Sequence, residues 1–121
     1  VPIGISKKIN YRTILNQKGV ATIIPEKGSI SYGILWRVSN DHIKNLDIYE
    51  GVQYGTYKKV NSSVMIAGYQ YPALVYIAKN DKVGLPRSLE YLDTLLRGIK
   101  YFNGHTKWYN EIKKLGYLQT A

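Results

Sequence analysis

The sequence predicts an α+β fold in which about six short strands precede two C-terminal helices. Alternating or β-branched apolar runs fill most of the chain up to residue 78, interrupted by one short helical segment. Beyond residue 88 the apolar residues instead recur every three or four positions, as they do on the buried face of a helix. The 121 residues suffice for one compact core, so we expect a single domain over residues 1–121.

The first three strands follow from alternation and from turn residues. Residues 8–15 alternate with period two, and the β-branched run 20–24 stops at Pro25, which has no N–H for a ladder hydrogen bond. The segment 26–29 has the composition of a turn, and the apolar run 30–38 forms the third strand. This spacing predicts a meander.

A short helix comes next. Ser39-Asn40-Asp41 supplies capping oxygens, and Gly51 can end the helix in a left-handed conformation. Glu50 stands at the C-terminal end, where the negative end of the helix dipole disfavours a carboxylate. This placement raises the chance of a functional role for Glu50, while a solvated surface glutamate is the alternative interpretation.

Three more strands and two helices complete the prediction. The strands cover residues 57–61, 63–67 and 71–78. Pro86-Arg87-Ser88 opens a helix that Asn103-Gly104 ends, and Thr106 caps the last helix. The last helix buries a stripe formed by Trp108, Tyr109, Ile112 and Leu115.

The net charge is +9, but the basic residues are spread along the chain and never form a run of three, so the sequence contains no dense cluster of positive charge. A solvated basic surface is therefore favoured over a nucleic-acid footprint, and acidic ligands are the third interpretation. The absence of Cys excludes a disulfide framework, and two His leave few ways to build a metal site, so we expect no cofactor. Apolar runs are too short to cross a membrane, which predicts a cytoplasmic protein without a membrane partner.

Common catalytic motifs are missing. The glycines lack the spacing of a phosphate-binding loop, and His42 and His105 are expected to be surface or capping residues. What remains is Glu50, followed by tyrosines at positions 54 and 57.

Several segments, taken in order, resemble the gamma-glutamylcyclotransferase-like family. They are Gly19-Val20-Ala21-Thr22-Ile23, Tyr32-Gly33-Ile34-Leu35-Trp36, the signature Leu46-Asp47-x-x-Glu50-Gly51 with Tyr57 seven residues past the glutamate, Val75-Tyr76-Ile77, and residues 86–98 with Tyr91. The resemblance covers roughly residues 10 to 104. It implies a small mixed β-barrel or sheet flanked by helices.

The resemblance also implies an enzyme that releases 5-oxoproline from a γ-glutamyl amine or γ-glutamyl amino acid. In such a reaction the substrate's own α-amine attacks its γ-carbonyl, so the protein need not supply a nucleophile. Glu50 matches the catalytic glutamate, which would take a proton from the ammonium and pass one to the leaving amine. Tyr57, Tyr91 and Tyr76 match pocket positions that would bind the substrate. The alternative for each tyrosine is an amphipathic wall residue without chemistry.

The sequence departs from the family at its start. Family members open with a strand and a Tyr-Gly-Ser-Asn loop whose N–H groups bind the glutamyl group, and no such segment precedes residue 8 here. Three explanations stay open: an N-terminal part is missing, a partner chain or second copy supplies the strand, or catalysis is lost. The last gives the alternative function, a non-catalytic module that sequesters a small anionic ligand or nucleic acid.

Overall fold

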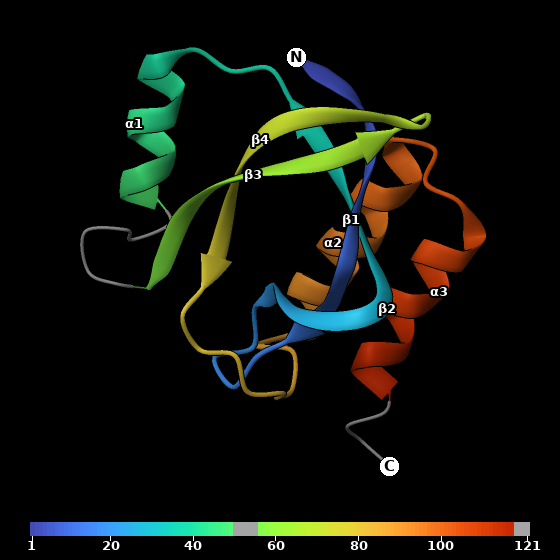
Figure 1. The fold of residues 1–121 in the computed structure, drawn as a ribbon. Coiled ribbons are helices and arrows are strands. Elements are labelled where there is room, and N and C mark those ends of the chain that lie inside the picture. Colours follow the sequence, from blue (N-terminus) through green and yellow to red (C-terminus); the bar gives the residue numbers. More distant parts are fainter. Residues whose placement is uncertain (50–55, 118–121) are drawn as a thin grey trace. The chain divides into compact units, whose positions relative to one another are not determined.

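The computed structural model of the chain describes residues 1–49 and 56–117 (Figure 1). Four strands and three helices occupy these residues. In chain order they are β1 (Pro2–Leu15), β2 (Ala21–Trp36), α1 (Asn40–Tyr49), β3 (Tyr57–Ile66), β4 (Tyr69–Ala78), α2 (Leu89–Tyr101) and α3 (Thr106–Tyr117). The predicted α+β class is confirmed, as is the order of strands, short helix, strands and two helices.

The number of strands was overestimated, because two predicted turns lie inside long strands. Most of the segments 20–24 and 30–38 belongs to the single strand β2, and most of 57–61 and 63–67 belongs to β3. The supposed turn at 26–29 is a bend. Gly28 and Asn10 both have positive φ, and the Gly28 N–H donates to Oδ1 of Asn10 at 2.9 Å. Turn residues thus let β2 bend here without ending it.

The sheet has the order β2-β1-β3-β4, so β2 and β4 are its two edges. Strand β3 runs antiparallel to β1, with Lys7 opposite Met65, and antiparallel to β4 along its full length. Ala67 and Gly68 connect β3 to β4 with positive φ angles of 49° and 83°, as a tight hairpin turn requires. Pro25 and Pro72 both lie on edge strands, where a missing N–H is tolerated.

The backbone divides into two compact units, each built from two stretches of chain. The first unit contains Val1–Arg12 and Pro25–Lys79, which include most of the sheet and α1. In this unit Val64 and Ala78 are buried, and the buried Ser6 donates its hydroxyl to the carbonyl of Gly33. The N-terminal ammonium donates to the carbonyl of Arg37, which fixes the start of β1 beside the end of β2.

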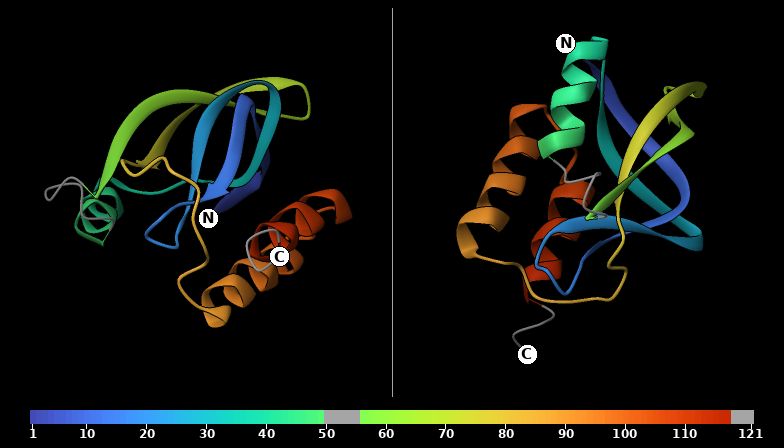
Figure 2. Two further views of the ribbon diagram at one scale, coloured as in Figure 1. Left: turned by 90° about the horizontal axis from the view of Figure 1, so that it is seen from below. Right: turned by 90° about the vertical axis from the view of Figure 1, so that its left-hand side faces the viewer.

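The second unit contains Thr13–Ile24 and the chain from Asn80 onward. Here α2 and α3 lie side by side (Figure 2), and the buried apolar side chains are Ile14, Leu15, Ile99, Trp108 and Ile112. Asn16 is 1% exposed and fully used: its Oδ1 accepts from the N–H groups of Lys18 and Val20, and its Nδ2 donates to the carbonyl of Asn80. A buried amide is stable when bonded in this way.

Both C-terminal helices begin with a side-chain cap. Ser88 accepts a hydrogen bond from the N–H of Tyr91 at 3.0 Å, as predicted for the start of α2. At α3 the cap lies one residue earlier than predicted, because Nδ1 of His105, and not Thr106, accepts from the N–H of Trp108. His105 is therefore a capping residue, in line with the expectation for it.

Candidate functional site

Asp47 of the family signature joins α1 to the β3–β4 hairpin. Its Oδ2 accepts a hydrogen bond from Nζ of Lys59 at 2.7 Å, and its Oδ1 accepts one from Oη of Tyr76 at 2.5 Å. Lys59 and Tyr76 are directly opposite each other in the β3–β4 ladder. Cross-strand partners share one face of a sheet, so a single carboxylate can bridge both side chains.

The same contacts determine the charge state of Asp47. The hydrogen bond from Lys59 and the one from the Tyr76 hydroxyl hold the pKa of Asp47 below its ordinary range. The carboxyl is therefore ionised at neutral pH, and the contact with Lys59 is an ion pair. A phenol that donates to a carboxylate presents its oxygen to other groups as an acceptor.

The ladder also brings two predicted site residues together. Tyr57 pairs with Ala78, and it lies two residues from Lys59 along β3. Side chains two residues apart on a strand share a face, so Tyr57 and Tyr76 are diagonal neighbours on the same face of the hairpin. Both are half-buried. The register therefore places these two tyrosines near each other, while their contact with substrate stays a prediction.

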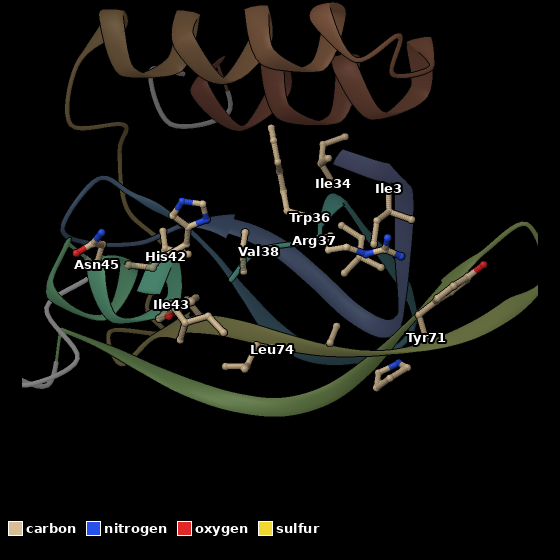
Figure 3. A pocket seen from close by; sticks show the side chains of 15 residues that line it. Ile3, Ile34, Trp36, Arg37, Val38, His42, Ile43, Asn45, Tyr71 and Leu74 are labelled. Carbon is tan, nitrogen blue, oxygen red and sulfur yellow. The ribbon is translucent and has the colours of Figure 1, made fainter. Parts of the chain in front are cut away.

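A cavity of about 1020 Å³ opens beside this face, within the first unit (Figure 3). Its wall is formed by α1, the end of β2, part of β4 including Tyr76, and Ile3 of β1. Helix α1 contributes four residues from one face: His42, Ile43, Asn45 and Leu46. The positions 42, 43, 45 and 46 share one side of a helix. The volume suits a small organic molecule.

The cavity wall is mainly apolar and partly exposed. Trp36, Tyr71 and Leu74 are 47%, 37% and 42% exposed although they face a common hollow. Arg37 follows β2 and is drawn among these side chains in Figure 3. None of the described lining side chains is acidic. Sequence reasoning missed Arg37 and Lys59, since nothing in a dispersed basic composition distinguishes one cation from another.

Tyr91 belongs to the second unit, at the first turns of α2. Its hydroxyl oxygen accepts a hydrogen bond from the N–H of Ala21 at 2.8 Å, and the Arg87 guanidinium lies 4.9 Å from the centre of its ring. These contacts give Tyr91 a structural role in holding the start of β2 near α2. Its predicted role in substrate binding stays a prediction.

Glu50, the predicted catalytic residue, lies outside the described residues. It follows Asp47 by three positions in the sequence. Within residues 1–49 and 56–117, no group of three His, Asp or Glu side chains could hold a metal ion. None of the helices in that part of the chain is long and apolar enough to cross a membrane.

Comparison with known proteins identifies the family. The AIG2-like family matches residues 31–103, more than half of the chain. A curated gamma-glutamylcyclotransferase from Mus musculus is 31% identical over 94 residues, covering 77% of this chain and 49% of the mouse protein. The chain thus spans about half the length of that relative.

Solved structures share the fold. An uncharacterized human protein has a TM-score of 0.86 at 19% identity, covering 93% of this chain and 73% of its own. YkqA from Bacillus subtilis gives 0.86 at 20%, covering 96% of this chain and 44% of its own. A gamma-glutamyl cyclotransferase gives 0.85 at 19%, with the same coverages as the human protein.

The chain belongs to the AIG2-like family. The predicted resemblance to gamma-glutamylcyclotransferase-like proteins is confirmed by the mouse relative and by the shared fold.

Proposed function

We propose that the protein is a gamma-glutamylcyclotransferase-type enzyme that converts a γ-glutamyl amine or γ-glutamyl amino acid into 5-oxoproline and a free amine. The observation that supports this proposal is the double hydrogen bond to Asp47. The aspartate of the signature anchors α1 to the hairpin that carries Tyr57 and Tyr76, beside a cavity of ligand size.

The reaction needs proton transfer and close positioning. Glu50 takes a proton from the substrate's α-ammonium, and the freed amine attacks the γ-carbonyl carbon to close a five-membered lactam. The bond from that carbon to the original amide nitrogen then breaks. The leaving amine receives the proton from Glu50, and the second proton that the lactam nitrogen loses goes with it, so the amine departs as an ammonium, no water is consumed and the carboxylate is regenerated.

Tyrosine hydroxyls position the reacting groups in this scheme. Because Tyr76 donates its proton to Asp47, its oxygen is suited to accept a hydrogen bond from the substrate ammonium. Tyr57, on the same face of the hairpin, is the second hydroxyl proposed to bind the glutamyl group. A role of Tyr91 in substrate binding is proposed from the family resemblance alone, beside its structural bond to Ala21.

The test is release of 5-oxoproline from γ-glutamyl-alanine and from γ-glutamyl-alkylamines. We expect product with the unchanged protein and a loss of about 100-fold or more in Glu50→Gln, which keeps the size of the side chain but cannot take a proton. Glu111→Gln is the matched control, since Glu111 is an exposed residue of α3. Product release that is undiminished in Glu50→Gln would refute the role of this residue.

The competing function is a binding module without turnover, and Arg37 in the cavity wall favours a small anionic ligand for it. Ligand binding without 5-oxoproline release by any γ-glutamyl substrate would favour this second function. Binding to a polynucleotide that weakens steeply with salt would indicate its nucleic-acid form.

A further inference from the structure

The cavity of the first unit combines an exposed apolar wall with the positively charged side chain of Arg37. Large apolar side chains that stay exposed around one hollow are a common sign of a binding site. Here Trp36, Val38 and Leu74 are 47%, 38% and 42% exposed, and Ile3 adds to the same wall.

Arg37 provides the cation. Its backbone is fixed, because its N–H donates to the carbonyl of Val1 at 2.8 Å and its own carbonyl accepts from the N-terminal ammonium. Among the described residues no salt bridge uses its guanidinium. A guanidinium keeps its charge at every physiological pH and binds carboxylates through two parallel N–H donors.

We propose that this cavity binds a ligand with a carboxylate at one end and an apolar chain at the other. The carboxylate pairs with Arg37, and the chain lies against Trp36, Val38 and Leu74. This inference rests on the proposed function, and it defines the substrate class as γ-glutamyl conjugates of apolar amines. The glutamyl part supplies the α-carboxylate, and the leaving amine supplies the apolar chain.

The polar groups of the cavity agree with the head of such a ligand. Asn45 of α1 and the Tyr76 oxygen can accept hydrogen bonds from an α-ammonium, which is bonded to the same carbon as the carboxylate. The absence of acidic side chains from the described wall disfavours a cationic group at the far end of the ligand, which agrees with an apolar chain there. An amine with a charged side chain would lose its hydration against this wall.

The experiment measures affinity and turnover separately. Calorimetry on the Glu50→Gln variant gives the Kd of γ-glutamyl conjugates of methylamine, butylamine and hexylamine, with octanoate as a carboxylate that lacks the glutamyl group. Release of 5-oxoproline is followed with the unchanged protein. We expect affinity to rise about 3- to 4-fold for each added methylene, and octanoate to bind more weakly than the hexylamine conjugate.

Two variants test the named contacts. Arg37→Gln is expected to weaken every conjugate by about 10-fold through loss of the charged hydrogen bonds. Leu74→Gln is expected to reduce the gain in affinity per added methylene. Lys58→Gln removes the same charge from an exposed position of β3 outside the cavity wall, so it is expected to change nothing.

Affinity that does not depend on chain length, an equal effect of Arg37→Gln and Lys58→Gln, or equal binding of octanoate would each overturn this inference. So would a dimer in light scattering together with no ligand binding, since a strand of a second copy would then occupy the cavity. Equal release of 5-oxoproline from all conjugates at equal affinity would keep the proposed function and refute only the substrate class. The expected affinities without any 5-oxoproline would keep the cavity assignment and refute the proposed function.

Discussion

Tyr76 of β4 donates its hydroxyl hydrogen to Asp47 of α1 across 2.5 Å, and its cross-strand partner Lys59 donates to the other oxygen of the same carboxylate. One short side chain therefore connects a helix to two strands. The aspartate belongs to the signature that defines the family resemblance. In the structure this aspartate holds α1 against the hairpin.

Removing the Tyr76 hydroxyl should loosen this connection. Tyr76→Phe keeps the ring but leaves Oδ1 of Asp47 without this donor, so the midpoint of thermal unfolding should fall by a few degrees. Tyr69→Phe is the control, because Tyr69 lies on the same strand and is 72% exposed. In a double-mutant cycle with Asp47→Asn, the two changes should cost less together than the sum of their separate effects. Additive effects would show that the bond contributes nothing.

The pH dependence of stability should reveal Asp47. Its pKa is depressed in the folded chain by Lys59 and Tyr76, so its contribution is present above the pKa of the unfolded residue, about 3.9, and is lost as pH falls through the folded pKa. Urea unfolding of the unchanged protein and of Asp47→Asn should differ by a constant amount between about pH 5 and pH 8. The difference should shrink in acid. A difference that grows on acidification contradicts the assignment.

Tyr91 should matter for stability whatever its part in substrate binding. Tyr91→Phe removes the acceptor for the Ala21 N–H, and the expected loss is about 1 kcal/mol of unfolding free energy. Tyr101→Phe, at a residue that is 80% exposed, should leave the free energy within experimental error. A Tyr91→Phe protein as stable as the unchanged one would show that water replaces the hydroxyl.

Alanine substitutions at two glycines can distinguish the free-energy cost of a positive φ from the cost of a steric clash. Gly19 and Gly28 have similar φ angles of 80° and 87°, but a Cβ at Gly19 would lie 2.3 Å from the backbone nitrogen of Arg87, while one at Gly28 meets nothing within 4 Å. Gly28→Ala should therefore cost about 1–2 kcal/mol, and Gly19→Ala about 3 kcal/mol or more. Chemical denaturation checks both values. Equal costs would mean that the chain around Arg87 yields easily.

The two edges of the sheet, β2 and β4, predict self-association or strand addition. Light scattering over a wide concentration range should show dimers that form as concentration rises. A strict monomer at every concentration would exclude the second copy as the source of an added strand.

Local patterns predicted the fold well where the signal was strong. The caps at Ser39 and Ser88 and the last two helices fall where they were expected, whereas β1 begins at Pro2, six residues before the alternation that predicted it. Turn composition misled the prediction inside β2 and β3, because β2 continues through the bend at Gly28, whose N–H bonds to Asn10, and because pairing with β4 holds Asn61 in extended chain. Tertiary pairing overrides local turn preference at such positions.

The candidate site was only partly accessible to sequence reasoning. The alternation along each strand shows which neighbours share a face with Tyr57 in β3 and with Tyr76 in β4. Only the register between the two strands shows that both tyrosines lie on the same face of the sheet. The structural role of Asp47 was not predicted, because its two hydrogen-bond donors lie 12 and 29 residues further along the sequence. The apolar cavity could not be predicted, since exposed and buried apolar residues look alike in a sequence.

The second unit draws its chain from both ends of the sequence, and this has a consequence for synthesis on the ribosome. In the folded protein the Asn16 side chain donates to the carbonyl of Asn80. The carbonyl of Leu15 accepts from the N–H of Gly84, and the carbonyl of Gly19 accepts from the N–H of Arg87. None of these partners exists until most of the chain has been translated. The segment Thr13–Ile24 must therefore lack these hydrogen-bond partners while the intervening strands form. In a chain truncated before residue 80, we expect a protease to cleave this segment.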